Sequence, residues 1–165
     1  MAIIDGQKIL TLSRQKTVTT ALTVGTDAYT ANDVVGGLIT FDVSNAAGSG
    51  IVRWASVVDD DAEKAELTLY LFDAAPTTIA DDAAFAPAIA DLKKYIGKIL
   101  FEAADYEDIN SNSVAMIGHG VSTDFLNIDF KTDTGNIYGY LVCTATPTYT
   151  AATDLTIRLG VWLDG

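Results

Sequence analysis

The sequence is poor in cysteine, histidine and positive charge, and each shortage excludes a class of protein. A single cysteine, Cys143, permits no intramolecular disulfide. With one histidine besides, a zinc site built from cysteines and histidines is excluded too. Ten Lys and Arg stand against 22 Asp and Glu, so the net charge is −12. We expect no nucleic-acid binding through a basic face, because the phosphate backbone would be repelled.

Long hydrophobic runs are missing as well. No apolar stretch approaches the ~20 residues of a membrane-spanning helix, so we expect no membrane segment. The opening MAIIDGQKIL carries Asp5 where a signal peptide has its apolar stretch, and no small-residue cleavage site follows. We therefore expect a protein that is made in a cytoplasm and stays there at first.

The apolar content is sufficient for one globular domain. The 165 residues are 49% hydrophobic and 19% charged, which is too hydrophobic for a disordered chain. Neither an internal repeat nor an interdomain linker is visible. We predict a single domain over residues 16–165, preceded by residues 1–15 as an N-terminal arm or an edge strand.

Alternation of apolar and other side chains with a period of two indicates β-strands along most of the chain. ELTLYLF at 66–72 places three leucines on one face, and GGLITFDV at 36–43 places Ile39, Phe41 and Val43 together. IVRWASVV at 51–58 places Arg53 with Ala55 and Val57. The strands predicted in this way are 17–24, 36–43, 51–58, 66–72, 95–103, 113–117, 124–130, 137–144 and 155–163.

Turn-forming residues separate these runs, for example in SNAAGSG, DDDAEK, NSNS and KTDTGN. Many short strands with turns between them predict an all-β fold, either a β-sandwich or a jelly-roll-like arrangement. Residues 78–95 differ, because they are rich in alanine and carry Pro87, which prevents one continuous helix. We predict a long crossover here with one or two short helical turns, and Asp81 and Asp82 stand in a helix-starting position. The helical spacing involves Ile89, Leu92, Lys93 and Ile96.

Residues with catalytic or ligand-binding chemistry are few, and none forms a known motif. His119, in IGHGVS, is flanked by glycine and is interpreted as a turn residue, while Cys143 is interpreted as a buried side chain of a strand. Calcium could be bound by acidic clusters at strand ends, but solvated loops are favoured because no EF-hand spacing is present. These clusters are Asp59–Asp61, Asp81 with Asp82, and Asp105 with Glu107 and Asp108. We assign no catalytic, cofactor-binding or metal-binding residue and expect no cofactor.

Aromatic side chains leave a sugar-binding surface open. Trp54, Trp162 and seven tyrosines are present, and aromatic rings on a sandwich face can stack on sugars. Within alternating strands such rings are more often part of the core or of its edge.

Two stretches resemble small structural proteins of tailed bacteriophage particles. In DAYTANDVVGGLITF (27–41) the matching residues are Tyr29, Asp33, Val34, Gly36 and Gly37. The second stretch, 66–101, has a leucine-rich strand, then Phe-Asp, a proline, Asp-x-Ala-Phe and Ala-Asp. The resemblance implies a particle component with a β-sandwich core and brings no catalytic signature.

The same residues have roles in folding. Asp33 can cap the turn that leads into a strand, and Gly36 and Gly37 allow a sharp entry. Phe72 and Phe85 can anchor the predicted crossover.

The resemblance favours a non-enzymatic virion structural protein, of the capsid decoration or cement kind. Such a protein would bind the major capsid protein on the outer head surface as a homo-oligomer, most simply a trimer, after synthesis in the host cytoplasm. Alternatives are a head–tail connector that forms rings, and a tail or fibre component that binds a glycan or receptor. A hydrolase that uses His119 is the weakest alternative.

Overall fold

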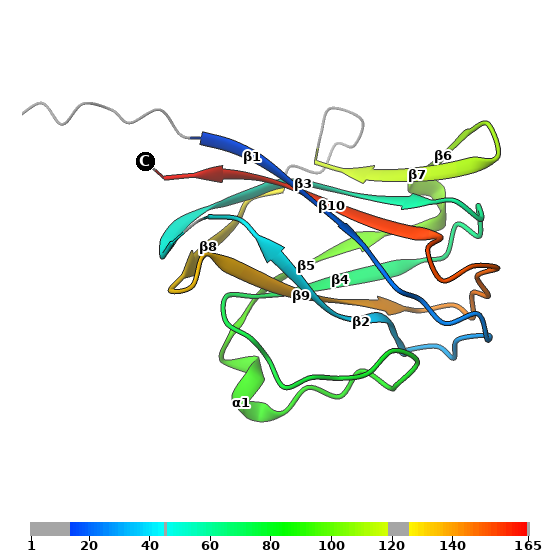
Figure 1. Ribbon diagram of the computed structural model, residues 1–165, viewed down its shortest axis with the longest axis horizontal. Coiled ribbons are helices and arrows are strands. Elements are labelled where there is room, and N and C mark those ends of the chain that lie inside the picture. Colours follow the sequence, from blue (N-terminus) through cyan, green and yellow to red (C-terminus); the bar gives the residue numbers. More distant parts are fainter. Residues whose placement is uncertain (1–13, 45, 119–125, 165) are drawn as a thin grey trace, which may run out of the picture.

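The computed structural model describes residues 14–44, 46–118 and 126–164, so His119 and residues 1–13 of the predicted arm lie outside the described residues. The strands form two antiparallel sheets that pack face to face (Figure 1). The larger sheet contains β1 (Arg14–Ala21), β3 (Gly48–Asp59), β6 (Tyr106–Ile109), β7 (Asn112–Ile117), β8 (Ile128–Thr132) and β10 (Leu155–Leu163). The smaller sheet contains β2 (Val34–Asp42), β4 (Leu67–Phe72), β5 (Tyr95–Phe101) and β9 (Asn136–Cys143). In the described ranges, helical structure is limited to α1 (Ile89–Leu92) and a 3-10 turn at Ala103–Asp105.

The strand pairing is nested. The first strand pairs with the last, β2 pairs with β9, β3 with β8, and β4 with β5. Such a pattern is one long antiparallel hairpin rolled into two sheets, which is the jelly-roll arrangement. The predicted all-β, jelly-roll-like sandwich is therefore confirmed.

Side chains of both sheets fill the space between them. Ile39, Phe41 and Val43 point into this core, as predicted, and all three are buried. The three leucines of β4 are also buried there. Cys143, at the end of β9, is fully buried as predicted, and burial raises the pKa of its thiol.

A β-bulge breaks the alternation predicted for 51–58. The register between β10 and β3 shifts between Gly160 and Val161, so that Val52 and Ala55 both point into the core. Arg53 was predicted to share a face with Ala55. Its guanidinium instead lies 4.9 Å from the exposed Trp162 ring. A bulge places one extra residue in one strand, so the side chains beyond it point to the opposite face of the sheet from the one that simple alternation predicts. Its position depends on how the strand pairs with its partner.

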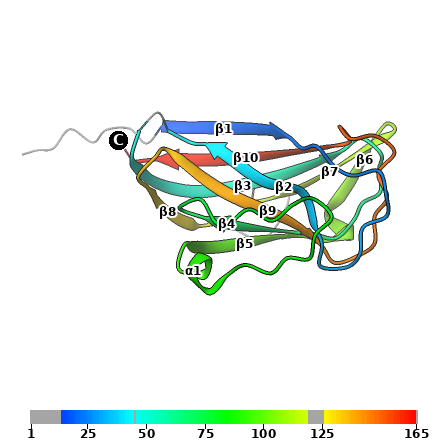
Figure 2. The ribbon, with the colours of Figure 1, turned by 60° about the horizontal axis from the view of Figure 1, so that its bottom comes forward.

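The segment 73–94 is long and holds one short helix, as predicted, but it is not a crossover. It joins β4 to β5, which are hydrogen-bonded neighbours, and so forms the end of the rolled hairpin. On the way it passes over the outer face of the smaller sheet (Figure 2). A second apolar cluster forms between segment and sheet, from Val34, Phe72, Tyr140 and Val142, with Ile79 and Phe85 packed against it. The segment thereby covers part of the outer face of the smaller sheet.

Several predicted boundaries move. β1 begins at Arg14, inside the range assigned to the arm, and it forms an edge of the larger sheet. The strand predicted at 124–130 is β8, Ile128–Thr132. Residues 48–50, predicted as a flexible turn, belong to β3, where a side chain at Gly50 would meet the backbone of β10. β6 was missed because its four residues include Glu107 and Asp108, and acidic residues are rare in strands.

Candidate docking site

The two stretches that carry the sequence resemblance contact each other. The backbone of residues 82–85 runs beside residues 32–34, with hydrogen bonds from Val34 N–H to Ala83 O and from Phe85 N–H to Asn32 O. Their lengths are 2.9 Å and 2.8 Å. The two stretches thus meet along residues 32–34 and 82–85, while β2 of the first stretch and β4 and β5 of the second belong to the smaller sheet itself.

Asp81 of the second stretch holds it to the first stretch through hydrogen bonds. Its Oδ1 accepts hydrogen bonds from the Tyr29 hydroxyl, at 2.7 Å, and from the Gly36 N–H, at 2.6 Å. The Tyr29 hydroxyl in turn accepts the Gly25 N–H. Burial, and next the bond to Asp81, raises the pKa of Tyr29, which keeps its hydroxyl protonated as a donor. Asp81 and Asp82 do not begin a helix, contrary to prediction, because α1 starts at Ile89.

Of the folding roles predicted for the first stretch, the cap formed by Asp33 is confirmed, but Gly36 and Gly37 lie inside β2, which begins at Val34, and not at its entry. Asp33 caps the turn, since its carboxylate accepts the Thr30 N–H at 2.8 Å. Gly36 and Gly37 have φ of 78° and 71° and occupy an irregularity in the pairing of β2 with β9. Glycine adopts this left-handed backbone without strain.

An apolar groove opens where the segment 73–94 leaves β5 uncovered. We call it the aromatic groove; its lining includes Tyr70, Phe85, Pro87, Leu92, Tyr95 and Lys98. Its volume is about 260 Å³. Tyr70 and Phe85 stack with their centroids 4.5 Å apart, and Phe85 also contacts Tyr140, so the floor is held by the second apolar cluster. The predicted anchoring role of Phe85 is confirmed.

Exposed apolar side chains surround the groove. Ile89 and Leu92, which were predicted from their helical spacing, do lie in α1, but they are 81% and 54% exposed. Tyr95 is 40% exposed. A helix that turns its apolar side chains to solvent beside an apolar groove is unusual for a closed fold, and it marks a contact surface.

The acidic clusters act in local capping. Asp59 is buried and accepts the N–H groups of Asp61 and Lys64 at 3.1 Å and 2.8 Å. The Asp61 carboxylate accepts the N–H and hydroxyl of Thr150. In the described part of the chain no three Asp, Glu, His or Cys side chains gather as metal ligands would.

Burial makes Asp59 a source of pH dependence. Desolvation, the largest cause, raises the pKa of its carboxyl above the ordinary value near 3.9. Between about pH 4 and that raised pKa, the native state binds the proton more tightly than the unfolded state, so stability falls as pH rises. We expect wild type to lose more stability than Asp59→Asn across this window, as measured by urea unfolding in a pH series. Parallel curves for the two proteins would contradict this.

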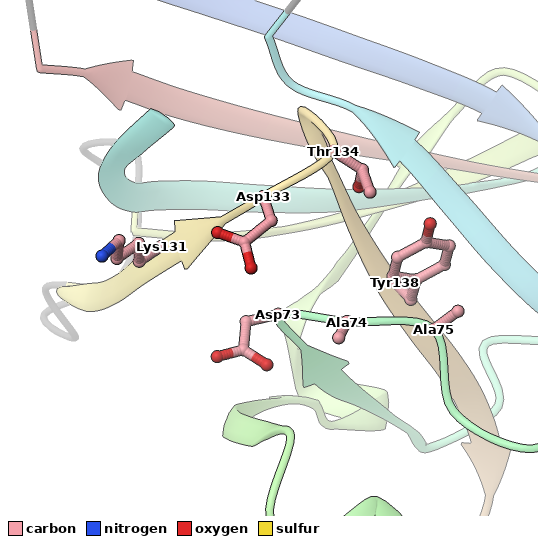
Figure 3. A pocket seen from close by; sticks show the side chains of 7 residues that line it. All are labelled: Asp73, Ala74, Ala75, Lys131, Asp133, Thr134 and Tyr138. Carbon is pink, nitrogen blue, oxygen red and sulfur yellow. The ribbon is translucent and has the colours of Figure 1, made fainter. Parts of the chain in front are cut away.

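A second pocket of about 200 Å³ lies between the end of β4 and the turn from β8 to β9. Figure 3 shows Asp73 and Asp133 on its rim, with the Lys131 side chain extending away from both. Two carboxylates without a third ligand do not define a metal site, so we assign this pocket no ligand.

The remaining candidate residues are separated from the aromatic groove. Trp54 is buried on the larger sheet, with the Arg158 guanidinium 5.4 Å from its ring, while Trp162 on the same sheet is 43% exposed. The turn interpretation and the hydrolase hypothesis for His119 fall outside the described residues. Sequence reasoning missed the groove because its lining residues are spread over β4, β5, α1 and the loop before α1.

Comparisons with known proteins add little. No family model matches the sequence, and no curated protein matches it. One match among the solved structures is a chain from "Israeli acute paralysis virus heated to 63 degree - full particle". The match has 10% identity and a TM-score of 0.32, and it covers 99% of this chain and 76% of that one. At this score the two backbones superpose poorly. No helix of the described residues is long and apolar enough to span a membrane.

Proposed function

We propose that the chain is a non-enzymatic structural protein of a tailed-bacteriophage particle, which decorates the outer head surface and reinforces it. The observation that carries the proposal is the nested pairing of β1 with β10, β2 with β9 and β3 with β8. Jelly rolls of this kind recur in viral capsid domains, although they also occur in lectins and cupins. The resemblance of the two stretches supports the virion choice, and these stretches are hydrogen-bonded to each other.

The exposed apolar surface fits a protein that works by contact. A decorating protein reinforces a shell by adding buried interface between neighbouring subunits of the major capsid protein. Standard specific interfaces bury about 1,600 Å² in total, which a domain of this size can supply. The aromatic groove and its rim provide an apolar centre for contact with a neighbouring subunit.

The test is to locate the protein on intact particles with a gold-labelled antibody. We expect label over the whole head, because a decorating protein repeats with the capsid lattice. Particles from a phage that lacks the gene serve as the control. Label confined to the tail or to one vertex would favour the connector or receptor-binding role. Absence of label from every particle would overturn the virion role itself.

A glycan-binding role on a tail or fibre is the second candidate. It is favoured by the exposed rings of Tyr95 and Trp162, since sugars stack on aromatic faces. Its test is a glycan array with wild type, Tyr95→Ala and Trp162→Ala. A hit that disappears in one variant would support this candidate over decoration.

A further inference from the structure

We propose that the aromatic groove receives Ile109 of a second copy of this chain, in a head-to-tail contact. This inference rests on the proposed function, because it names the surfaces through which the expected homo-oligomer would form. Its test needs no phage particle, so the inference can fail while the proposed function stands.

The first half of the contact is an exposed apolar side chain beside a free carboxylate. Ile109 ends β6 at the tip of the β6–β7 hairpin and is 58% exposed. Residues two apart in a strand share a face, so Glu107 lies on the same face of β6 as Ile109. Asp108 is paired with Lys64 at 2.7 Å, whereas Glu107 forms no ion pair within the described ranges. The tip therefore presents an isoleucine and an uncompensated negative charge.

The second half is the aromatic groove, whose rim has the opposite charge. Lys98 lines it. The ion pairs of the described residues use Lys16, Lys64 and Lys94, which leaves Lys98 without an ion pair. A free lysine in an apolar groove stands out in a chain of net charge −12, and it complements Glu107 at the tip.

The shape and chemistry of the groove favour an aliphatic side chain. An apolar cavity of about 150 Å³ can hold a benzene molecule, so a groove of about 260 Å³ admits an isoleucine. A sugar needs several polar partners for its hydroxyls, and the groove is lined chiefly by rings and by Pro87 and Leu92.

The two halves of the contact come from different molecules. The β6–β7 tip and α1 lie at opposite ends of the molecule in both views (Figure 1; Figure 2). One molecule therefore cannot fill its own groove. In a head-to-tail contact each copy gives its tip to one neighbour and its groove to another, and such contacts close into rings, of which a trimer is the smallest, or continue as filaments. A reciprocal contact about a twofold axis would stop at a dimer, so growth of the wild type beyond a dimer distinguishes the two arrangements.

The test is sedimentation velocity of the full chain and of two variants over a concentration series. We expect wild type to assemble, and we expect Ile109→Ser and Leu92→Ser each to weaken assembly about tenfold or more. That range follows from the loss of one buried aliphatic side chain. Trp162→Ser, which removes a ring that is 43% exposed on the larger sheet, is the control and should assemble as wild type does. All the altered side chains are exposed, so the fold is expected to persist.

Mixing the two weakened variants gives the decisive result. Ile109→Ser keeps an intact groove and Leu92→Ser keeps an intact tip, so one good contact can form between them. We expect a one-to-one heterodimer that grows no further. Charge reversal adds a second arm: Lys98→Glu should weaken assembly, and Glu107→Lys in the same chain should restore it.

Three outcomes would overturn the proposal. Wild type could stay monomeric throughout the series, the variants could assemble as wild type does, or the mixture could fail to give the heterodimer. A monomeric wild type whose binding to heads is abolished by Leu92→Ser would show that the groove receives a capsid segment instead. The proposed function would survive that result, while this inference would not.

Discussion

Replacing Phe41 by Ala is expected to lower the free energy of unfolding by about 3–5 kcal/mol, the usual cost of a cavity left by a buried phenylalanine. Phe41 is fully buried between the sheets and lies opposite Ile137 of β9. Gly139 leaves the ring its space, because a Cβ there would lie 3.1 Å from the Phe41 Cε2. Neighbouring strands cannot close the void without breaking their pairing. Urea unfolding followed by near-ultraviolet circular dichroism measures the change.

Thr40→Ala is the matched control for Phe41→Ala. Thr40 is the adjacent residue of β2 and is exposed, so its loss should cost less than about 1 kcal/mol. For a chain of this length, 1 kcal/mol corresponds to roughly 2–4 °C in Tm, and the two variants should differ by roughly 10 °C. Equal losses in both variants would mean that Phe41 is not part of the core.

Replacing Asp81 by Ala is expected to cost about 2–3 kcal/mol and to loosen the segment 73–94 from the sheet. The substitution leaves the Tyr29 hydroxyl and the Gly36 N–H without the acceptor that they share. A hydrogen bond to a charged group contributes roughly 1.5–3 kcal/mol. Because Asp81 is partly exposed, the two bonds together contribute less than twice that amount. Hydrogen exchange should report faster exchange at Gly36 and Val34, whose amides bond to this segment.

The conservative variant separates the hydrogen bonds from a general effect on the loop. Asp81→Asn keeps an oxygen acceptor in place and should lose about half as much stability as the Ala variant. Asp27→Asn, an exposed aspartate in the loop that also holds Tyr29, should change nothing measurable. If Asp81→Ala were as stable as wild type, the segment would be held by its apolar contacts alone.

The sequence by itself determined the strands and much of the core. A period of two is imposed by the pleat, and it survives in β2, β4 and β9 because each has apolar residues to turn inward. The turn at Asp33 was equally readable, because an aspartate bonds its own local backbone. β6 was missed because its acidic residues are untypical of a strand. Its backbone is extended because it forms strand hydrogen bonds with β7, which lies beside it.

Only the tertiary structure decided how these strands are joined and what they leave exposed. The bulge opposite Gly160 depends on the register of β10 against β3, which no local pattern encodes. Whether residues 73–94 cross between sheets or return to the neighbouring strand is likewise a matter of topology. The helical spacing of Ile89 and Leu92 was readable, but not that both face solvent. The aromatic groove is formed by residues that are distant in the sequence, so it exists only once long-range contacts bring the strands together. The same contacts place the groove and Ile109 far apart on the molecule.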